Sequence, residues 1–421
     1  MPPVLSEHRL VSREEKIFTF LVVLMAWANV YALPSYPIGI GEIIFFLFIP
    51  LYYSKKITCS IRVYEFFFFI WFVYAVLVTL ILMNYFDAPI SKFFSIARVF
   101  FYWILIFFFG KNLFELNLFK KFVNIFATLL SVFIVVQLVV YILKGFLIPG
   151  FFLNVSLNDG GMTGLQLYEK YVKMAGWTGV CRPNGFLCEP AHCSEFLFIA
   201  LIIMLNEKKL SVVKKMQFIL FSLAIVFTQS TEGILLLTMA CFIYVLIEKK
   251  YAFLKIPFFV LLLCSSVLLF TGFFSTGMHS IDRIINIVNG SNDIDNSSLL
   301  RLNNGFGLFF ELPISFQLFG TGLGLFDYVF EEMSILNAQK FMNTFSVVFF
   351  MSGFLGALVW NLALVVFFRK SGLLGKCLVL GFVAMSMGSS IFCQPQMVWI
   401  FLLIIDDIRK KNDRCSCVEL Q

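Results

Sequence analysis

Charged side chains are scarce in this sequence. Asp, Glu, Lys and Arg make up only 14% of the 421 residues, whereas hydrophobic residues make up 60% and the mean hydropathy is +0.91. An ordinary soluble domain contains about 25% charged residues, so this composition excludes that class. The sequence also lacks internal repeats and any segment typical of a separate soluble domain. We therefore interpret residues 1–421 as a single domain.

Signals for metal, cofactor and nucleic-acid binding are missing as well. The ten cysteines form no metal-binding pattern, and half of them lie within apolar runs, where cysteine packs as a small apolar residue. Cys188, His192 and Cys193 lack a fourth ligand, so we expect no metal ion and no cofactor. Basic residues do not alternate with aromatic residues outside the apolar runs, so the net charge of +7 does not indicate nucleic acid. Cys181 and Cys188 could form a disulfide, because both fall on the side of the membrane that we expect to be oxidising.

Long apolar runs dominate the sequence instead. Most are long enough to cross roughly 30 Å of hydrocarbon, where only helices and closed barrels satisfy their backbone polar groups. The runs are continuous rather than alternating, which predicts an all-α integral membrane protein with about twelve transmembrane helices. We place these spans at 17–33, 38–54, 64–85, 93–110, 122–143, 190–206, 216–229, 232–248, 256–272, 342–368, 377–393 and 396–405. The seventh and the last are short, and we expect each to extend into its neighbouring turn.

The positions of Lys and Arg predict the orientation of these spans. Most of the 32 basic residues lie in alternate loops and in the two terminal segments, which places both termini in the cytoplasm. The first span follows Arg9, Arg13 and Lys16, so it could also be a cleaved secretory signal; the eleven later spans favour an uncleaved helix. Two long loops, 144–189 and 273–341, then face outward, and we expect each to be a partly ordered cap.

Charged residues inside the spans gather in the outer half. Glu42, Arg98 and Glu195 each lie about one turn or more below the outer end of a span, and Glu232 begins another span. The inner half has nothing comparable beyond Asp406 and Asp407. Transporters that alternate access place polar groups near the midplane, whereas an enzyme of the outer leaflet needs charge near that surface. The alternative is that Glu42, Arg98 and Glu195 pair with one another to lock the helices.

The decapeptide "CRPNGFLCEP" at 181–190 opens a span with unusual polarity. Pro190 suits the first turn of a helix, so Glu189 falls at the helix N-terminus, where it could act as a base. Arg182 offers a planar guanidinium that matches phosphate oxygens. The alternative is a capped helix start with an interfacial arginine.

The second long loop contains further candidate residues. Arg301 stands three residues after Ser298, and Gly320, Gly322 and Gly324 form a glycine-rich turn. Turns of this kind can present backbone N–H groups to an anion. The turn lacks the strand and helix context of a dinucleotide fingerprint. The alternative is a flexible loop.

In their order along the chain, these motifs resemble the O-antigen polymerase and ligase superfamily of bacterial envelopes. The matching motifs are R-x-x-G-x-x-x-E-P at 182–190, "TQSTEGILLL" at 228–237, S-x-x-R at 298–301 and F-G-x-G-x-G at 319–324. Asn343, followed by Gly353 and Gly356, matches the last family element. Met342 stands where the ligase branch has a histidine thought to be catalytic, which favours the polymerase branch.

The resemblance implies a metal-independent membrane glycosyltransferase at the periplasmic face of the bacterial inner membrane. The donor would be a polysaccharide on undecaprenyl diphosphate, the acceptor one oligosaccharide repeat on the same lipid, and a chain-length regulator protein a partner. Glu189 would be the base, with Glu195 as the second candidate. The residues expected to bind substrate are Arg182, Arg301, Arg98, Gly320, Gly322, Gly324 and Asn343. An O-antigen ligase and a lipid-linked oligosaccharide flippase are the alternatives.

Overall fold

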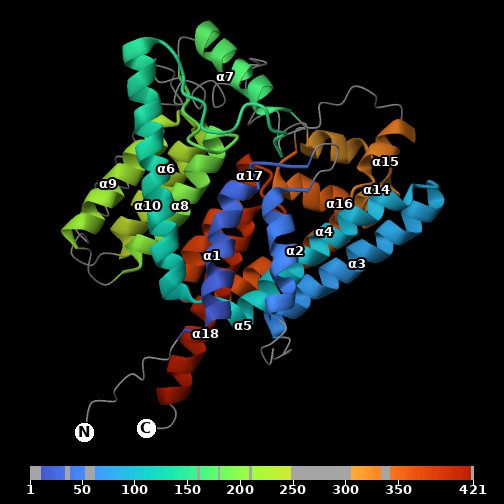
Figure 1. The fold of residues 1–421 in the computed structure, drawn as a ribbon. Coiled ribbons are helices and arrows are strands. Elements are labelled where there is room, and N and C mark those ends of the chain that lie inside the picture. The colour runs from blue at the N-terminus through green and yellow to red at the C-terminus, as the bar shows by residue number, and fades with distance from the viewer. Residues whose placement is uncertain are drawn as a thin grey trace, which may run out of the picture.

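The computed structural model describes residues 11–33, 38–52, 62–158, 162–178, 181–207, 211–247, 305–332 and 342–418. This part of the chain is all-α, as predicted, and contains no strand, only three isolated β-bridges. Figure 1 shows the helices as one bundle, with the start of α1 and the end of α18 toward the same end and α7 at the opposite end.

The helices follow the predicted spans closely. In chain order they are α1 (Arg13–Ala28), α2 (Ile40–Tyr52), α3 (Val63–Tyr85), η1 (Ile90–Lys92), α4 (Phe93–Trp103), the π-helix η2 (Ile104–Gly110), α5 (Lys111–Leu113), α6 (Leu116–Lys144), α7 (Gly164–Thr178), α8 (Pro190–Leu205), α9 (Val212–Phe227), α10 (Thr231–Ile247), α14 (Ile314–Phe319), α15 (Phe326–Glu332), α16 (Thr344–Lys370), α17 (Leu373–Gly388) and α18 (Pro395–Val418). Residues 305–311 are also helical. The predicted span at 256–272 lies outside the described residues.

Two boundaries differ from the prediction for local reasons. Helix α1 begins at Arg13, because Ser12 and Glu15 form a reciprocal capping box, and it ends before Asn29, not at residue 33. Helix α17 ends at Gly388, not at residue 393, because the chain turns there and Cys393 takes a left-handed φ of +53°. Helices α9 and α18 extend into their neighbouring turns, as expected.

Four helical stretches are long and apolar enough to cross a membrane. They are Glu65–Tyr85, Ile90–Leu113, Leu116–Lys144 and Thr344–Lys370. Four shorter apolar helices accompany them: Ile40–Ile49, Pro190–Leu205, Thr231–Ile243 and Leu373–Gly388. The described residues therefore suggest a possible multi-pass membrane protein.

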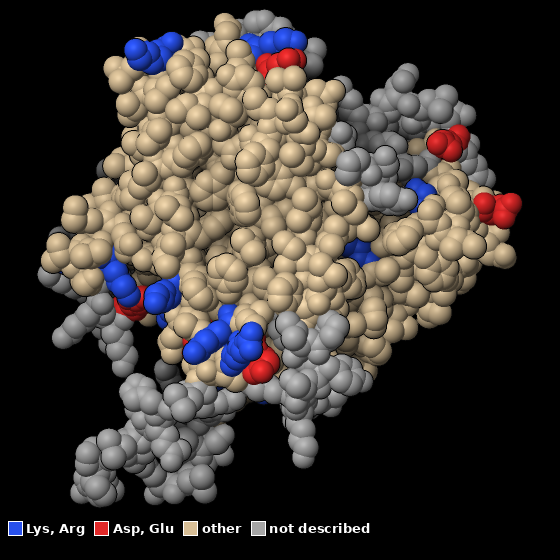
Figure 2. Space-filling model, viewed as in Figure 1, with Lys and Arg blue, Asp and Glu red and all other residues tan. Residues whose placement is uncertain are grey.

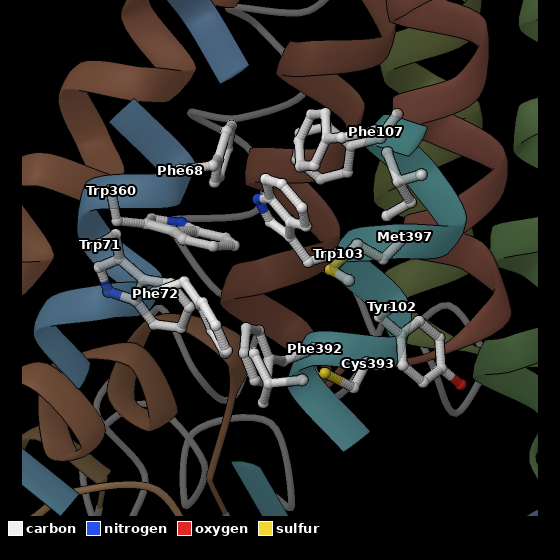
Figure 3. Close-up of a pocket in the computed structure, with 13 residues that line it drawn as sticks. Phe68, Trp71, Phe72, Tyr102, Trp103, Phe107, Trp360, Phe392, Cys393 and Met397 are labelled. Carbon is white, nitrogen blue, oxygen red and sulfur yellow. The ribbon is translucent and has the colours of Figure 1, made fainter. Parts of the chain in front are cut away.

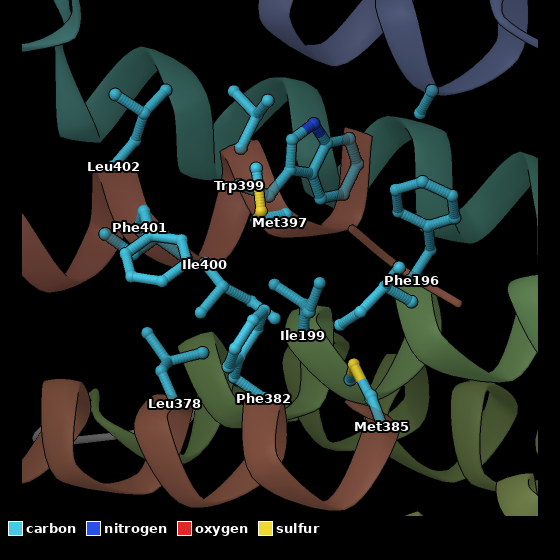
Figure 4. Packing of buried hydrophobic residues seen from close by; sticks show 14 of the residues in the cluster. Phe196, Ile199, Leu378, Phe382, Met385, Met397, Trp399, Ile400, Phe401 and Leu402 are labelled. Atoms are coloured by element: carbon cyan, nitrogen blue, oxygen red, sulfur yellow. The ribbon is translucent and has the colours of Figure 1, made fainter. Parts of the chain in front are cut away.

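Helices α8 and α18 form the centre of the bundle. All residues from 193 to 205 and from 397 to 405 are buried, which is typical of helices surrounded by other helices. Figure 4 shows their side chains packed together with those of α17. Trp399 of α18 also donates a hydrogen bond from Nε1 to the carbonyl oxygen of Val22 in α1, at 2.9 Å. The centre is thus filled by side chains.

Figure 2 shows charged side chains at the top, at the bottom and at the right of the molecule, around a largely apolar surface. Exposed apolar residues include Leu47, Ile81 and Ile142. At the start of α3, the buried carboxylate of Glu65 pairs with Lys111, with Nζ 3.1 Å from Oε1. The sequence predicts no buried charge in the inner half of the spans beyond Asp406 and Asp407. Glu65 is not counted there, because it lies at the very start of the predicted span 64–85.

Both long loops contain helices, as predicted for partly ordered caps. The first contains α7, and the described part of the second contains residues 305–311, α14 and α15. Cys181 and Cys188 remain thiols, so the considered disulfide is not formed. The Cys188 sulfur lies 3.7 Å from the carbonyl oxygen of Val30. Burial raises the pKa of the Cys181 thiol to about 11, so its reactive thiolate form is scarce at neutral pH.

The glycine-rich turn packs against a kink in α16. Gly353 interrupts that helix with a φ of +61°, and Gly320 in the turn has a φ of +92°. The backbone N–H groups of Thr321 and Gly322 donate to two carbonyl oxygens of α16, at 2.6 and 3.1 Å. A Cβ atom on Gly320 would lie 2.6 Å from the backbone nitrogen of Gly353. Only glycine allows these two backbones to approach so closely.

We predict that Gly320→Ala and Gly353→Ala each destabilise the protein. Both positions combine a left-handed φ with a backbone atom where the new methyl group would sit, and the strain alone costs about 1–3 kcal/mol. Gly307→Ala is the matched control, because a Cβ there has nothing within 4 Å. The measurement is the temperature at which purified protein loses its monodisperse elution. Unchanged stability of both variants would contradict the close packing of turn and kink.

Candidate functional site

A buried ion pair joins α2 to α4. Glu42 is 2% exposed, and its Oε1 accepts hydrogen bonds from Arg98 Nε at 2.9 Å and from the Tyr102 hydroxyl at 2.8 Å. Asn29 completes the group, since its Oδ1 accepts from the Glu42 amide and its Nδ2 donates to the Tyr102 hydroxyl. Two of the residues considered for mutual pairing, Glu42 and Arg98, are thus paired. Arg98 Nη2 is buried and has no hydrogen-bond partner among the described residues, so one donor remains for a ligand.

Helices α6 and α7 and the chain at Gly150 hold the 181–190 segment in place. Gln137 of α6 donates to the carbonyl oxygen of Gly185 and accepts from the Gly185 amide, at 3.3 and 2.8 Å. The Tyr171 hydroxyl of α7 donates to the Cys188 carbonyl at 2.8 Å. Gly185 has a φ of +58°, and its carbonyl lies directly against Gly150. The segment is therefore an ordered turn rather than a free loop, because its backbone is bonded to α6 and α7.

The predicted helix start is confirmed. Glu189 is the N-cap residue of α8 and Pro190 occupies its first turn. The Glu189 carboxylate makes no capping hydrogen bond to this helix, so the first backbone N–H groups do not hold it. Arg182 and Glu189 are both half-buried at the same end of the bundle. A carboxylate at a helix N-terminus is stabilised by the helix dipole.

Glu195 lies fully buried in the second turn of α8. Its Oε2 accepts a hydrogen bond from Gln396 Nε2 at 2.6 Å, whereas its Oε1 has no partner within the described segments. Gln396 and His192 line a cavity of about 60 Å³, and Asn29 lines it as well. A cavity of this size holds water rather than a sugar ring. Through Asn29, the cavity connects the surroundings of Glu195 to those of Glu42.

A second cavity is lined by aromatic side chains. Figure 3 shows rings from α3, α4 and α16 converging on it, among them Phe72, Trp103 and Trp360. Tyr102 lines this cavity with its ring while its hydroxyl binds Glu42. The aromatic cavity therefore adjoins the Glu42–Arg98 pair. Apolar rings near the guanidinium of Arg98 are suited to an amphiphile that has an apolar chain and an anionic headgroup.

The glycine-rich turn has its amides occupied. The N–H groups of Gly320, Thr321 and Gly322 donate to backbone carbonyls, and that of Leu323 donates to the Thr79 hydroxyl at 2.8 Å. Acceptors in α14, α16 and α3 already bind these four amides, so they are not available to an anion. The suggestion from the sequence that the turn presents its N–H groups to an anion is therefore wrong for these four amides. If the turn takes part in substrate binding, Gly320, Gly322 and Gly324 would act by fixing the position of the turn.

Asn343 serves as the N-cap of α16. Its Oδ1 accepts from the Ser346 amide at 2.8 Å and its Nδ2 donates to the Met387 carbonyl at 3.1 Å, in a fully buried position. Both ends of its amide are thus bonded to the protein. Met342 packs in a small apolar cluster next to Phe350. Arg301 lies outside the described residues.

Several polar residues of the site escaped the sequence analysis. Asn29, Tyr102 and Gln396 stand at or near helix ends with no motif around them, so only the packing reveals their role. His192 had a signal, since it precedes Glu195 by three residues and shares a helix face with it. Glu232, at the start of α10, accepts a hydrogen bond from the Ser389 hydroxyl, which ties α10 to the turn after α17.

The arrangement can bind an anionic amphiphile and move a proton. Arg98 has one buried donor without a partner among the described residues, close to the aromatic residues that pack around Tyr102, and Arg182 and Glu189 lie in an ordered turn at the same end of the bundle. No protein-family model and no curated protein matches this sequence.

Proposed function

We propose that this chain is an O-antigen polymerase, which joins oligosaccharide repeats carried on undecaprenyl diphosphate at the outer face of a bacterial inner membrane. The chain would cross the membrane about twelve times, with both termini in the cytoplasm. The family resemblance supplies the reaction, and the arrangement of charges at one end of the bundle supports it.

The observation that carries the proposal is the buried Nη2 donor of Arg98, which has no hydrogen-bond partner among the described residues. The Nε of the same guanidinium neutralises Glu42 at 2.9 Å. A buried donor without a hydrogen-bond partner lowers stability by about 1–3 kcal/mol. An anionic ligand that accepts this hydrogen bond would recover that free energy. The aromatic rings beside Tyr102 would face the apolar part of the same ligand, whose chain must lie outside the cavity of about 40 Å³ that these rings enclose. A lipid diphosphate has both parts.

The reaction would run as a single displacement. The acceptor sugar hydroxyl loses its proton to Glu189 and attacks the anomeric carbon of the donor. The bond between that carbon and the phosphate oxygen breaks, and the lipid diphosphate leaves with the electron pair. Arg182, Arg301 and Arg98 would stabilise the negative charge on the leaving group. No metal ion takes part in these steps.

Burial favours Glu189 over Glu195 as the base. Glu189 is half-buried at the start of α8, whereas Glu195 is 0% exposed, and its partner Gln396 lines a cavity of only about 60 Å³. A sugar hydroxyl can reach the first carboxylate and not the second. Glu195 would instead hold Gln396 in place beside His192.

Two related functions are less well supported. A ligase would need the histidine that Met342 replaces, and the apolar Met342 side chain cannot move a proton. A flippase would need a polar path through the centre, where buried side chains of α8 and α18 are packed. Both remain outcomes of the assay described below.

We predict that α7 and the start of α9 lie on opposite sides of the membrane. The test introduces single cysteines as Lys173→Cys and Lys215→Cys, both at exposed positions, into a variant lacking the native cysteines. A membrane-impermeant maleimide should label position 173 in cells whose outer membrane is permeabilised, and position 215 only after the inner membrane is opened. Labelling in the reverse order would overturn the orientation.

We predict that the reconstituted protein elongates lipid-diphosphate-linked repeats without nucleotide sugar or divalent metal. Glu189→Gln, which keeps the shape and removes the base, should slow elongation by about 10²–10⁴. Glu169→Gln, at an exposed position of α7, is the matched control and should elongate normally. Movement of repeats between leaflets without elongation would favour a flippase, and transfer only to a lipid A core acceptor would favour a ligase.

We predict that Arg182→Lys and Arg301→Lys each lower polymer yield by about 10²–10³, because lysine cannot bind two phosphate oxygens side by side. Arg98→Lys keeps a cation that can pair with Glu42 and removes the Nη2 donor, so a loss much smaller than that of Arg182→Lys would show that Arg98 only braces Glu42. Arg13→Lys, at an exposed position of the opposite end, is the control. Yields are compared at equal amounts of membrane protein. Full-length polymer from the Arg182→Lys variant would show that a fixed guanidinium is not needed there.

A further inference from the structure

A basic cavity lies at the end of the bundle opposite to the candidate site. It measures about 430 Å³, within the roughly 300–1,000 Å³ typical of ligand sites. Helices α6, α8 and α9, which pack pairwise, form its walls. Its lining residues are Asn117, Lys120, Lys121, Val123, Asn124, Ala200, Ile203, Met204, Glu207 and Lys214.

The charges of this cavity are positive in balance. Lys120, Lys121 and Lys214 stand against the single carboxylate of Glu207, which pairs with Lys214. Asp406 also acts electrostatically on Lys120. The Asp406 carboxylate is already compensated, because Arg409 and Lys410 bind it at 2.7 and 2.9 Å. Lys120 and Lys121 therefore have no described ion pair of their own, and their positive charges face the cavity together.

The rest of the lining is suited to a headgroup that continues into an apolar chain. Asn117 and Asn124 add hydrogen-bonding amides near the lysines, while Ile203 and Met204 are apolar. Toward the middle of the bundle, Gln217 of α9 donates a hydrogen bond to the Thr128 hydroxyl of α6 at 3.3 Å, one turn beyond Asn124. This bond ties the two helices together above the cavity.

An exposed apolar stripe leads away from the same lysines. Ile125, Leu129 and Val132 follow Lys121 at helical spacing on one face of α6, and each is at least 45% exposed. A molecule with its anionic group at Lys121 would therefore have an apolar surface for its tails directly alongside.

We propose that this cavity binds the phosphodiester headgroup of an anionic phospholipid from the leaflet on the lysine-rich side. Basic cavities between membrane helices are suited to such headgroups. Lys120 and Lys121 would bind the phosphate oxygens, the two asparagine amides the glycerol part, and the acyl chains would follow Ile125 and Leu129. The proposal does not depend on the polymerase activity, because it concerns the opposite end of the bundle.

The test compares bound lipid on the full-length protein by native mass spectrometry. Protein is released from nanodiscs of phosphatidylcholine that contain phosphatidylglycerol, an anionic phospholipid. Wild-type protein should retain phosphatidylglycerol, and Lys120→Gln/Lys121→Gln should retain it about 30-fold more weakly, since each lysine near the membrane surface contributes roughly fivefold. Lys170→Gln/Lys173→Gln removes the same charge from exposed positions on α7 and is the control. It should retain phosphatidylglycerol as wild type does.

Other outcomes decide against the proposal. Equal retention by wild type and the Lys120→Gln/Lys121→Gln variant would overturn it, as would an equal loss in the control. Displacement of the lipid by a large excess of inorganic phosphate would indicate a site for a soluble anion instead. If the double variant does not purify, Lys121→Gln alone gives the answer, because Lys121 is exposed and its loss leaves the core intact. Unchanged retention by that variant would also count against lipid binding.

Discussion

The ion pair between Glu42 and Arg98 organises the end of the bundle on which the candidate site is built. A carboxylate buried among apolar helices costs several kcal/mol unless a partner lies beside it, so α2 and α4 must meet where these two side chains meet. Tyr102 and Asn29 extend the bond to α1, and Asn29 reaches the small cavity lined by His192 and Gln396. The position of the candidate site thus follows from the need to satisfy one buried charge.

The helices could be predicted from the sequence because they depend on local properties. Apolar runs and Pro190 at the first turn of α8 are visible in the chain itself, and the structure confirms them. The capping box of Ser12 and Glu15 is also visible in the sequence. The predicted span 17–33 does not use it and therefore begins four residues after α1 does. Partners across the bundle could not be predicted, because packing of α3 against α16, for example, depends on the shapes of both helices.

The candidate site was less predictable than the fold for the same reason. Arg182 and Glu189 stood out because they share one segment with Gly185, whereas Asn29 and Gln396 come together from opposite ends of the chain. The anion-binding role considered for the glycine-rich turn was wrong for a different reason. Its residues permit an anion-binding conformation, but the kink at Gly353 supplies carbonyl groups that occupy its amides. Sequence reveals which backbone groups are able to bind, and only tertiary structure reveals which are already bound.

The central place of α18 has a consequence for how the protein is made. Its buried face contacts α1, α8, α17 and η2, yet it follows all of them in the chain. During synthesis these helices are made before the helix that fills the space between them. The Trp399–Val22 hydrogen bond joins residues 377 positions apart, and contacts of such long range form late in folding. Until α18 is made, the earlier helices enclose an incomplete core, whose apolar side chains lack the residues that cover them in the finished structure.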